Sequence, residues 1–309
     1  MMAELTKKAS FTIRTDLDPL ARIWRNRPAI PESPVCIHPL EYAGEPAADK
    51  IGRIRQRLAA YCTDGLLVTA LDDIAWTLNL RGSDVHCNPV FVSYLLISPR
   101  SVTLYINKVK LSQEVEDYLA SEQITVEPYE AVAEGLRKYD GDKLLIDPAA
   151  TNYTLATAMD AEMVVYAASP IPAMKAVKNE AEVAGFRAAM IRDGVAMVKF
   201  LAWLKPAVEA GGQTELTLDE RLTALRAEQP LFRGISFDTI VGYEAHGAIV
   251  HYEATPETDV PVEPRAGAHR QWGAVCRRYD RHHPDNSLGR PHRRTAEGVY
   301  ACSEGTYTA

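Results

Sequence analysis

Two histidines in the sequence GYEAHGAIVHY are the first candidates for chemistry. His251 ends the apolar run GAIV, and His246 lies five residues before it. An imidazole titrates near neutral pH, so either side chain could donate a hydrogen bond or shuttle a proton. The alternative for His251 is a structural histidine, partly buried on a strand. His246, in the preceding turn, is expected to be structural or peripheral.

A second polar group occupies the segment NLRGSD. Arg81, Ser83 and Asp84 lie within four consecutive positions of it. Such a set could approach a neighbouring active site, which makes Arg81 a candidate substrate-binding residue, or it could serve a domain contact. A capped turn held by an ion pair is the interpretation that the residue types favour.

A third group consists of residues whose side chains can bind a metal ion. They are Cys276, His282, His283 and His292. Their spacing matches no recognised zinc pattern, so we expect no metal site there. The five cysteines of the chain are scattered and odd in number, which predicts no disulfide framework and favours a reducing compartment.

Composition limits the class of protein. The net charge of -7 argues against nucleic acid or an anionic membrane as partner, since both need a basic surface. No apolar run approaches the roughly 18 residues of a membrane span. The first residues, MMAELTKKAS, lack the apolar region of a signal peptide, which predicts a cytoplasmic location.

The elements that must position these residues fall into two predicted domains. Residues 1–45 are proline-rich and irregular, and residues 46–172 alternate between helical and strand patterns, which indicates a mixed sheet covered by helices. The predicted helices are 46–62, 111–121, 129–138 and 150–160. The predicted strands begin with LLVTA, FVSYLLIS and SVTLYIN, the last two joined by a hairpin turn, and continue with 124–128, 143–146 and 162–167.

The second predicted domain covers residues 173–265. Asn179 and Glu182 have the spacing of a capping box at the start of a long helix that Pro206 should close. Thr217 and Glu220 repeat this spacing before a helix at 218–228. FDTIVGY and GAIVHYEA then predict two strands.

Residues 266–309 have a different composition. They contain seven arginines and no lysine, and four of the chain's eight histidines. So little apolar surface is available that disorder is expected.

Three collinear stretches resemble the three-domain Xaa-Pro aminopeptidases, also called aminopeptidase P. The stretches are VTALDDIAWTLNLRGSDVHCNPVFVSYLLI, AVKNEAEVAGFRAAMIRDGVAMVKFLAWL and ISFDTIVGYEAHGAIVHYEATPETDVPVEPR. The resemblance implies an α/β creatinase-like N-terminal-type domain at 46–172, followed at 173–265 by the beginning of a catalytic domain of the pita-bread fold. This sequence departs from the family pattern at Glu244, where a glycine is expected.

The resemblance also implies a reaction. Members of this family remove an N-terminal residue that precedes proline, using two divalent metals, Mn or Zn, that activate a shared water. They are expected to act on peptides with proline in the second position and to form homodimers. His251 matches the family histidine that lines the active site. The metal ligands lie in LIDSG and GTTDITRT segments and further along, and neither segment follows Arg265.

A one-base slip near codons 265–266 would account for this difference. Written in permitted codons and shifted by one base, residues 266–278 allow LVLIDSGGQYVDG, and YDRHHPDN allows TTDITRT. We therefore expect residues 266–309 to be a frameshifted tail and the chain as given to be inactive, with no metal pair. The alternatives are a creatinase-type C–N hydrolase and a non-catalytic pita-bread-like binding module.

Overall fold

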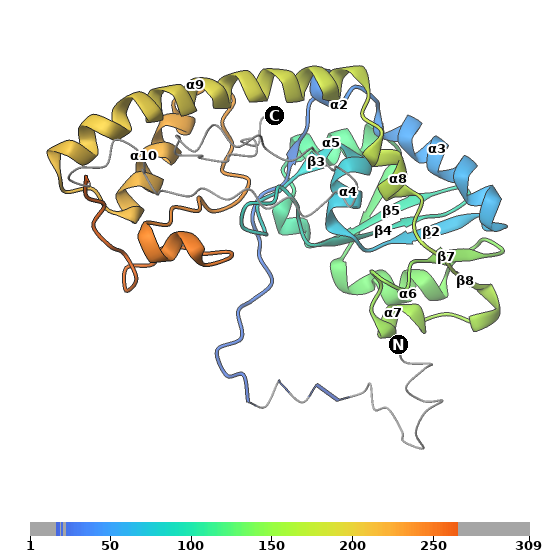
Figure 1. Cartoon of the computed structure of the whole chain (residues 1–309). Helices are drawn as coiled ribbons and strands as arrows, with labels where there is room; N and C mark the ends of the chain where they lie inside the picture. The colour runs from blue at the N-terminus through green and yellow to red at the C-terminus, as the bar shows by residue number, and fades with distance from the viewer. Residues whose placement is uncertain (1–16, 19, 21–22, 265–309) are drawn as a thin grey trace. The chain divides into compact units, whose positions relative to one another are not determined.

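The computed structural model describes residues 17, 18, 20 and 23–264, which form two compact units (Figure 1). The first unit contains the described residues up to Ile37, together with Ala47–Asp84 and Val90–Ala176. The second contains His38–Pro46, Val85–Pro89 and the described residues from Val177 onward.

The first unit is built on a six-stranded sheet with the order β6-β5-β4-β2-β7-β8. β4 runs antiparallel to its two neighbours, β2 and β5, and the other adjacent pairs are parallel. The β4–β5 pair is the predicted hairpin, and the prediction of a mixed α/β sheet is confirmed. The bounds are β2 Gly65–Val68, β4 Ser93–Ile97, β5 Val102–Ile106, β6 Ile124–Glu127, β7 Leu144–Ile146 and β8 Val164–Tyr166.

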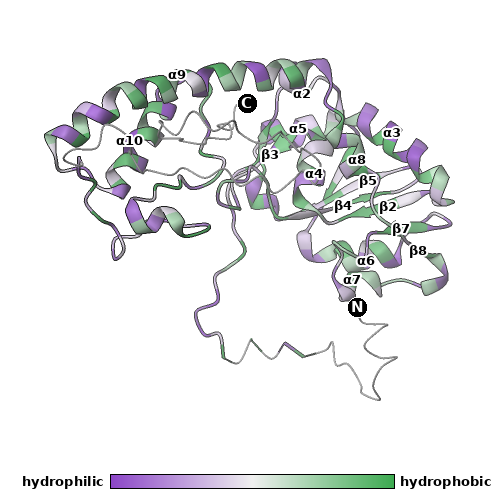
Figure 2. Cartoon of the chain, viewed as in Figure 1, coloured by the Kyte–Doolittle hydropathy of each residue, from purple (hydrophilic) through white to green (hydrophobic). Residues whose placement is uncertain are grey.

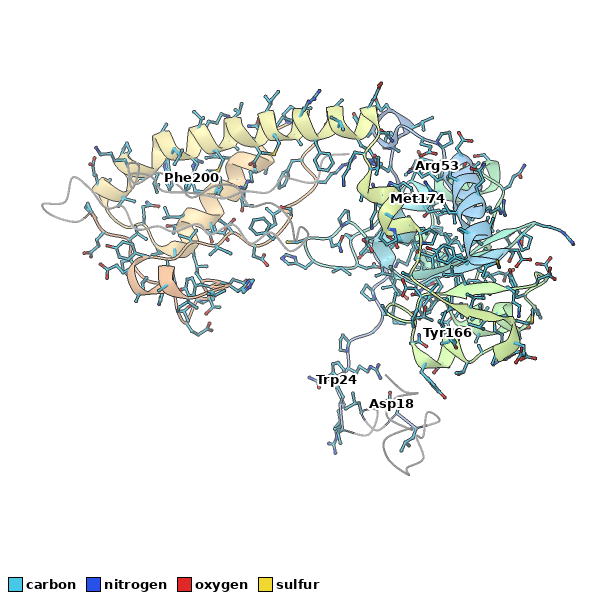
Figure 3. All side chains as sticks on the ribbon, turned by 45° about the vertical axis from the view of Figure 1, so that its right-hand side comes forward. Asp18, Trp24, Arg53, Tyr166, Met174 and Phe200 are labelled. Carbon is cyan, nitrogen blue, oxygen red and sulfur yellow. The ribbon has the colours of Figure 1, made fainter. Side chains whose placement is uncertain are left out.

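Helices cover both faces of this sheet, as Figure 1 shows. Neighbouring strand residues point to opposite faces, so Leu66 and Leu67 belong to different core clusters. Leu66 packs in the larger cluster with residues of α3, α4, α5 and α8, including Met174, which is labelled in Figure 3. Leu67 packs with α6 and α7. The bounds are α3 Ala47–Leu58, α4 Leu71–Leu78, α5 Gln113–Ser121, α6 Val132–Arg137, α7 Tyr153–Ala156 and α8 Ile171–Ala176.

Three helices of this unit differ from the sequence prediction, and one of them is α8, where only a domain boundary was predicted. α4 was not predicted, although Leu71, Ile74 and Leu78 have helical spacing, because a segment of eight residues is short for a helix and six of them are buried. The helix predicted at 150–160 is confined to α7, whose first turn is capped by the side chain of Asn152. A two-residue pair, β1 (Cys36–Ile37) with β3 (Leu80–Arg81), completes the unit.

The second unit begins with the short helix α2 (Leu40–Ala43) and the long helix α9 (Glu180–Ala210). The predicted capping box is present: the Glu182 amide donates to Asn179 Oδ1 at 2.9 Å, and the Asn179 amide donates to Glu182 Oε2 at 2.8 Å. The prediction that the helix ends at Pro206 is wrong. A proline removes one backbone hydrogen bond, but Leu204 and Val208 on either side of it are buried and hold the last turn in place.

α10 (Glu215–Ala227) packs against α9 and forms the core of the second unit with it. The helix begins earlier than predicted, because Thr214 is the capping residue and Thr217 its partner in the capping box. Phe200 of α9, labelled in Figure 3, is 3% exposed and packs against Trp203, with ring centroids 5.8 Å apart.

The two strands predicted at 237–243 and 247–254 are not formed, and this prediction is wrong. In the described residues after α10, the regular element is the short helix η6 (Glu244–Ala248), and the β-type residues are the isolated bridge residues Phe232, Tyr243 and Pro261, the last paired with Thr214. A strand needs a hydrogen-bonded neighbour. Among the residues that the structure describes, the second unit has no sheet that could supply one.

Apolar surface is exposed along α9, where Figure 2 shows hydrophobic residues through the length of the helix. These residues are between 43% and 69% exposed, and they are Phe186, Met190, Ile191, Val195, Val198 and Leu201. Exposed apolar surface of this extent is typical of a face that packs against further protein. No helix in the described part of the chain is long and apolar enough to span a membrane.

Candidate functional site

The first turn of α10 positions a buried carboxylate. The Thr217 amide donates to Thr214 Oγ1 at 3.3 Å, and the Thr214 amide donates to Thr217 Oγ1 at 2.8 Å. These bonds fix the first helical residue, Glu215, whose side chain is fully removed from solvent. A negative charge is favourable at this end of a helix, because the free backbone N–H groups point toward it.

Three donors converge on Glu215 and form what we call the Glu215 cluster, with Tyr243, His246 and Tyr252. The Tyr243 amide donates at 2.6 Å, the Tyr252 hydroxyl at 2.6 Å, and His246 Nδ1 lies 3.0 Å from Oε2. The His246 side chain is 24% exposed, and its ring lies 4.5 Å from the ring of Tyr252. Because an ionised carboxylate only accepts, the proton of His246 facing it must be on Nδ1.

The electrostatics of the Glu215 cluster follow from burial. Burial raises the pKa of the Tyr252 phenol, and its hydrogen bond to Glu215 raises that pKa further. Tyr252 therefore stays a neutral donor at physiological pH. The cluster satisfies one buried charge with three donors and binds the segment containing η6 to the start of α10. His246 is thus hydrogen-bonded within the cluster, and its role in substrate binding stays a prediction.

His251 lies in an exposed turn after η6, with a φ of 56°. It is therefore not the partly buried strand histidine that was the alternative to a chemical role. The adjacent residue Tyr252, and not His251, bonds to Glu215. The proposed action of His251 on substrate stays a prediction.

Glu244 also has a positive φ, 49°. This is the position at which the family resemblance predicts glycine. A residue with a side chain is strained in this conformation, so glutamate costs conformational energy here that glycine would not.

The NLRGSD group divides between two tasks in the first unit. Arg81 Nη1 donates to the carbonyl oxygens of Ala75 at 3.0 Å and Leu80 at 2.9 Å, at the C-terminal end of α4. The ion pair that was expected in this turn is formed by Asp84 with Lys110, and both side chains are buried. Asp84 also accepts a hydrogen bond of 2.6 Å from the Val92 amide. These contacts hold the turn together; substrate binding by Arg81 stays a prediction.

The residues that the structure describes do not fit a pair of divalent metals. Both oxygens of Glu215 already accept hydrogen bonds within its cluster. In this part of the chain, three metal-ligating side chains come together at His86, Cys87 and Asp238, a set with a single carboxylate. A dinuclear centre needs several carboxylates to bridge two ions. Cys276, His282, His283 and His292 lie outside the described residues.

Sequence reasoning missed Glu215 and the group around His86. The threonines on either side of Glu215 could have placed it in the first turn of a helix. Its partners could not be found, because the segment that supplies them was predicted as strand. His86 and Asp238 lie 152 positions apart, and nothing in the sequence brings them together.

Comparisons with known proteins match both units. The creatinase/prolidase N-terminal domain matches residues 26–182, and metallopeptidase family M24 matches residues 184–278. The protein named "Probable Xaa-Pro aminopeptidase P" of Ajellomyces dermatitidis is 37% identical over 263 residues, which are 79% of this chain and 42% of that protein. Aminopeptidase P1 of Arabidopsis thaliana is 31% identical, over 84% of this chain and 47% of its own length.

Solved structures agree with these matches. The X-prolyl aminopeptidase of Caenorhabditis elegans, described as a cytosolic enzyme with a di-nuclear active site, has a TM-score of 0.74 and 27% identity, over 79% of this chain and 41% of its own. The Xaa-Pro dipeptidase of Bacillus anthracis has a TM-score of 0.53 and 18% identity, over 70% of this chain and 58% of its own, and shares the fold. The chain thus spans less than half the length of the three aminopeptidases from Ajellomyces dermatitidis, Arabidopsis thaliana and Caenorhabditis elegans. The chain belongs to the family of proteins with a creatinase/prolidase N-terminal domain, and its residues 184–278 match metallopeptidase family M24; proteins named Xaa-Pro aminopeptidase are among its relatives.

Proposed function

We propose that this chain is a portion of an Xaa-Pro aminopeptidase without the ligands of the dinuclear metal site, and that as given it does not hydrolyse peptides. The observation that carries the proposal is the content of residues 266–309. They hold neither the LIDSG nor the GTTDITRT ligand segment in the present reading frame, yet allow both after a shift of one base. The described residues offer no dinuclear ligand set in their place.

The parent enzyme would cleave the bond before a proline in the second position of a peptide. Two divalent metals, Mn or Zn, would supply an activated water and polarise the carbonyl when bound. We expect that enzyme to be a cytoplasmic homodimer. The contribution of this chain's residues would be at the substrate side, where His251 donates a hydrogen bond to the peptide carbonyl or moves a proton.

Two measurements test the proposal. Resequencing codons 260–320 from independent template should reveal a one-base error that restores LIDSGGQYVDGTTDITRT. The chain as given should not hydrolyse an Ala-Pro peptide with Mn²⁺ or Zn²⁺, whereas the protein expressed to the end of the restored frame should. Hydrolysis by the chain as given would overturn the claim of inactivity.

The restored enzyme also tests His251 and the rival activity. His251→Ala should lower kcat/KM by about 10²–10⁴-fold, the range for loss of a general acid–base group. The control is His246→Asn, which should lower the free energy of unfolding but reduce kcat/KM less than His251→Ala does. Cleavage of creatine in preference to Ala-Pro would favour the creatinase-type alternative. A correct gene sequence with residues 266–309 ordered against the rest of the chain would favour the binding module.

A further inference from the structure

A tight turn in the second unit presents two metal-ligating side chains. The Asn88 amide donates to the Val85 carbonyl at 3.1 Å, which makes His86 and Cys87 the two central residues of a turn. Cys87 has a φ of 56°. That conformation ordinarily favours glycine or asparagine, so the cysteine is kept there against a conformational cost.

A third side chain reaches the same turn from a distant part of the sequence. Asp238 Oδ1 lies 2.8 Å from His86 Nε2, and the ligand atoms of His86, Cys87 and Asp238 all lie within 4.8 Å of one another. The three residues belong to one unit, because Val85–Pro89 and the residues from Val177 onward cluster together. Imidazole, thiol and carboxylate therefore converge on one point from two segments.

We propose that His86, Cys87 and Asp238 bind one Zn²⁺ ion, with the remaining coordination position open to water. The donor types decide the metal: a thiolate with an imidazole suits zinc and cobalt, whereas magnesium, calcium and manganese prefer oxygen ligands alone. Ligand atoms around tetrahedral zinc lie about 3.3–3.8 Å apart, given bonds of roughly 2.0–2.3 Å. The His86 side chain is 74% exposed and the Asp238 side chain 43% exposed, so small side-chain rotations can bring the ligand atoms to that spacing.

The electrostatic environment supports a cation. The carboxylates of Asp238 and Glu253 give the surroundings of His86 and Cys87 a negative charge. A divalent ion bound there would offset this charge together with that of a Cys87 thiolate.

Cobalt titration of the full chain tests the site, because a cobalt–thiolate bond gives a charge-transfer absorption that other ligands do not give. We expect one equivalent of Co²⁺ to produce this band and Zn²⁺ to abolish it. Cys87→Ser should remove the band. His86→Gln and Asp238→Asn should weaken binding by more than the roughly 10–100-fold that loss of an outer-sphere partner causes.

Controls separate this site from the other cysteines. The double variant Cys276→Ser, Cys302→Ser and the variant Cys62→Ser should keep the band and its stoichiometry. His86 is exposed, so His86→Gln can be compared with the unchanged chain without loss of folding, which circular dichroism verifies. A band that survives Cys87→Ser, or that disappears with the tail cysteines, overturns the proposal, as does the absence of any cobalt–thiolate band.

Discussion

Asp193 of α9 and Arg226 of α10 form a buried ion pair. Arg226 Nε donates to Asp193 Oδ1 at 2.9 Å. The Arg226 side chain is 7% exposed and the Asp193 side chain 3% exposed. At the surface, Lys199 Nζ of α9 lies 2.9 Å from Oε2 of Glu228, the residue that caps the end of α10. Both of these side chains are about half exposed. The two pairs connect the same elements at the same distance in different surroundings.

Asp193→Ala is expected to destabilise the second unit by about 3–5 kcal/mol, because it leaves the charge of Arg226 buried and unpaired. Lys199→Ala should change stability by no more than about 1 kcal/mol, since an exposed pair is weakened by solvent. Hydrogen exchange in peptides from α9 and α10 measures both changes. Exchange in β4 and β5 should be unaffected in either variant, and equal effects of the two substitutions would contradict the argument.

The Glu215 cluster gives a prediction with a matched pair of tyrosines. Tyr252→Phe removes a 2.6 Å hydrogen bond to a buried carboxylate and should cost about 1.5–3 kcal/mol. Tyr243→Phe removes an exposed 3.1 Å hydrogen bond to the Glu263 carbonyl and should stay within about 0.5 kcal/mol. Urea unfolding followed by hydrogen exchange of the α10 peptides compares them. A larger loss for Tyr243→Phe would show that Glu215 does not depend on the phenol.

Glu244→Gly should stabilise the chain by about 1 kcal/mol. Its φ of 49° is strained for glutamate and accessible to glycine, and the relief exceeds the entropy that glycine adds to the unfolded state. Ala245→Gly, in the same helix η6, is the control: it is not among the positive-φ residues of the described chain, so the substitution should cost about 0.5–1 kcal/mol. Thermal unfolding of both variants should therefore shift in opposite directions.

The sequence predicted the sheet of the first unit well because its strands are marked by local patterns. LLV, SYLLI and VTLYI are buried apolar runs bounded by turn residues, and their hairpin is local. The family resemblance added the domain order and marked Glu244 as a departure.

The second unit was predicted less well, because its structure depends on contacts between distant residues. The run GAIVHYEA has the composition of a strand, but strand formation needs a partner that the described residues do not supply. Tyr252 instead turns to Glu215, 37 positions earlier, and the turn exposes Ile249 and Val250. Such pairings are decided by tertiary packing and leave no local signal.

Asp64 gives the last prediction, on acid stability. Burial favours its neutral form, but hydrogen bonds from the Tyr139 hydroxyl at 2.6 Å and the Asp142 and Lys143 amides outweigh this and lower the pKa of Asp64. A carboxyl whose pKa is lower in the folded state binds fewer protons there than in the unfolded state. Its contribution to stability is therefore present above the unfolded pKa of about 4, and is lost as pH falls through the folded pKa.

Asp64→Asn keeps the shape of the side chain but removes this titration. We expect the free energy of unfolding of the first unit to fall less steeply in the variant between about pH 5 and pH 3, the range in which carboxyl groups ordinarily titrate. Urea midpoints measured at each pH test this. Asp160→Asn is the control, because Asp160 caps a short helix near the same edge with one amide at 3.0 Å. Identical slopes for Asp64→Asn and the unchanged chain would mean that the three donors stabilise the protonated carboxyl as well as the charged one. The contact between Asp64 and the 139–143 segment would then not depend on pH.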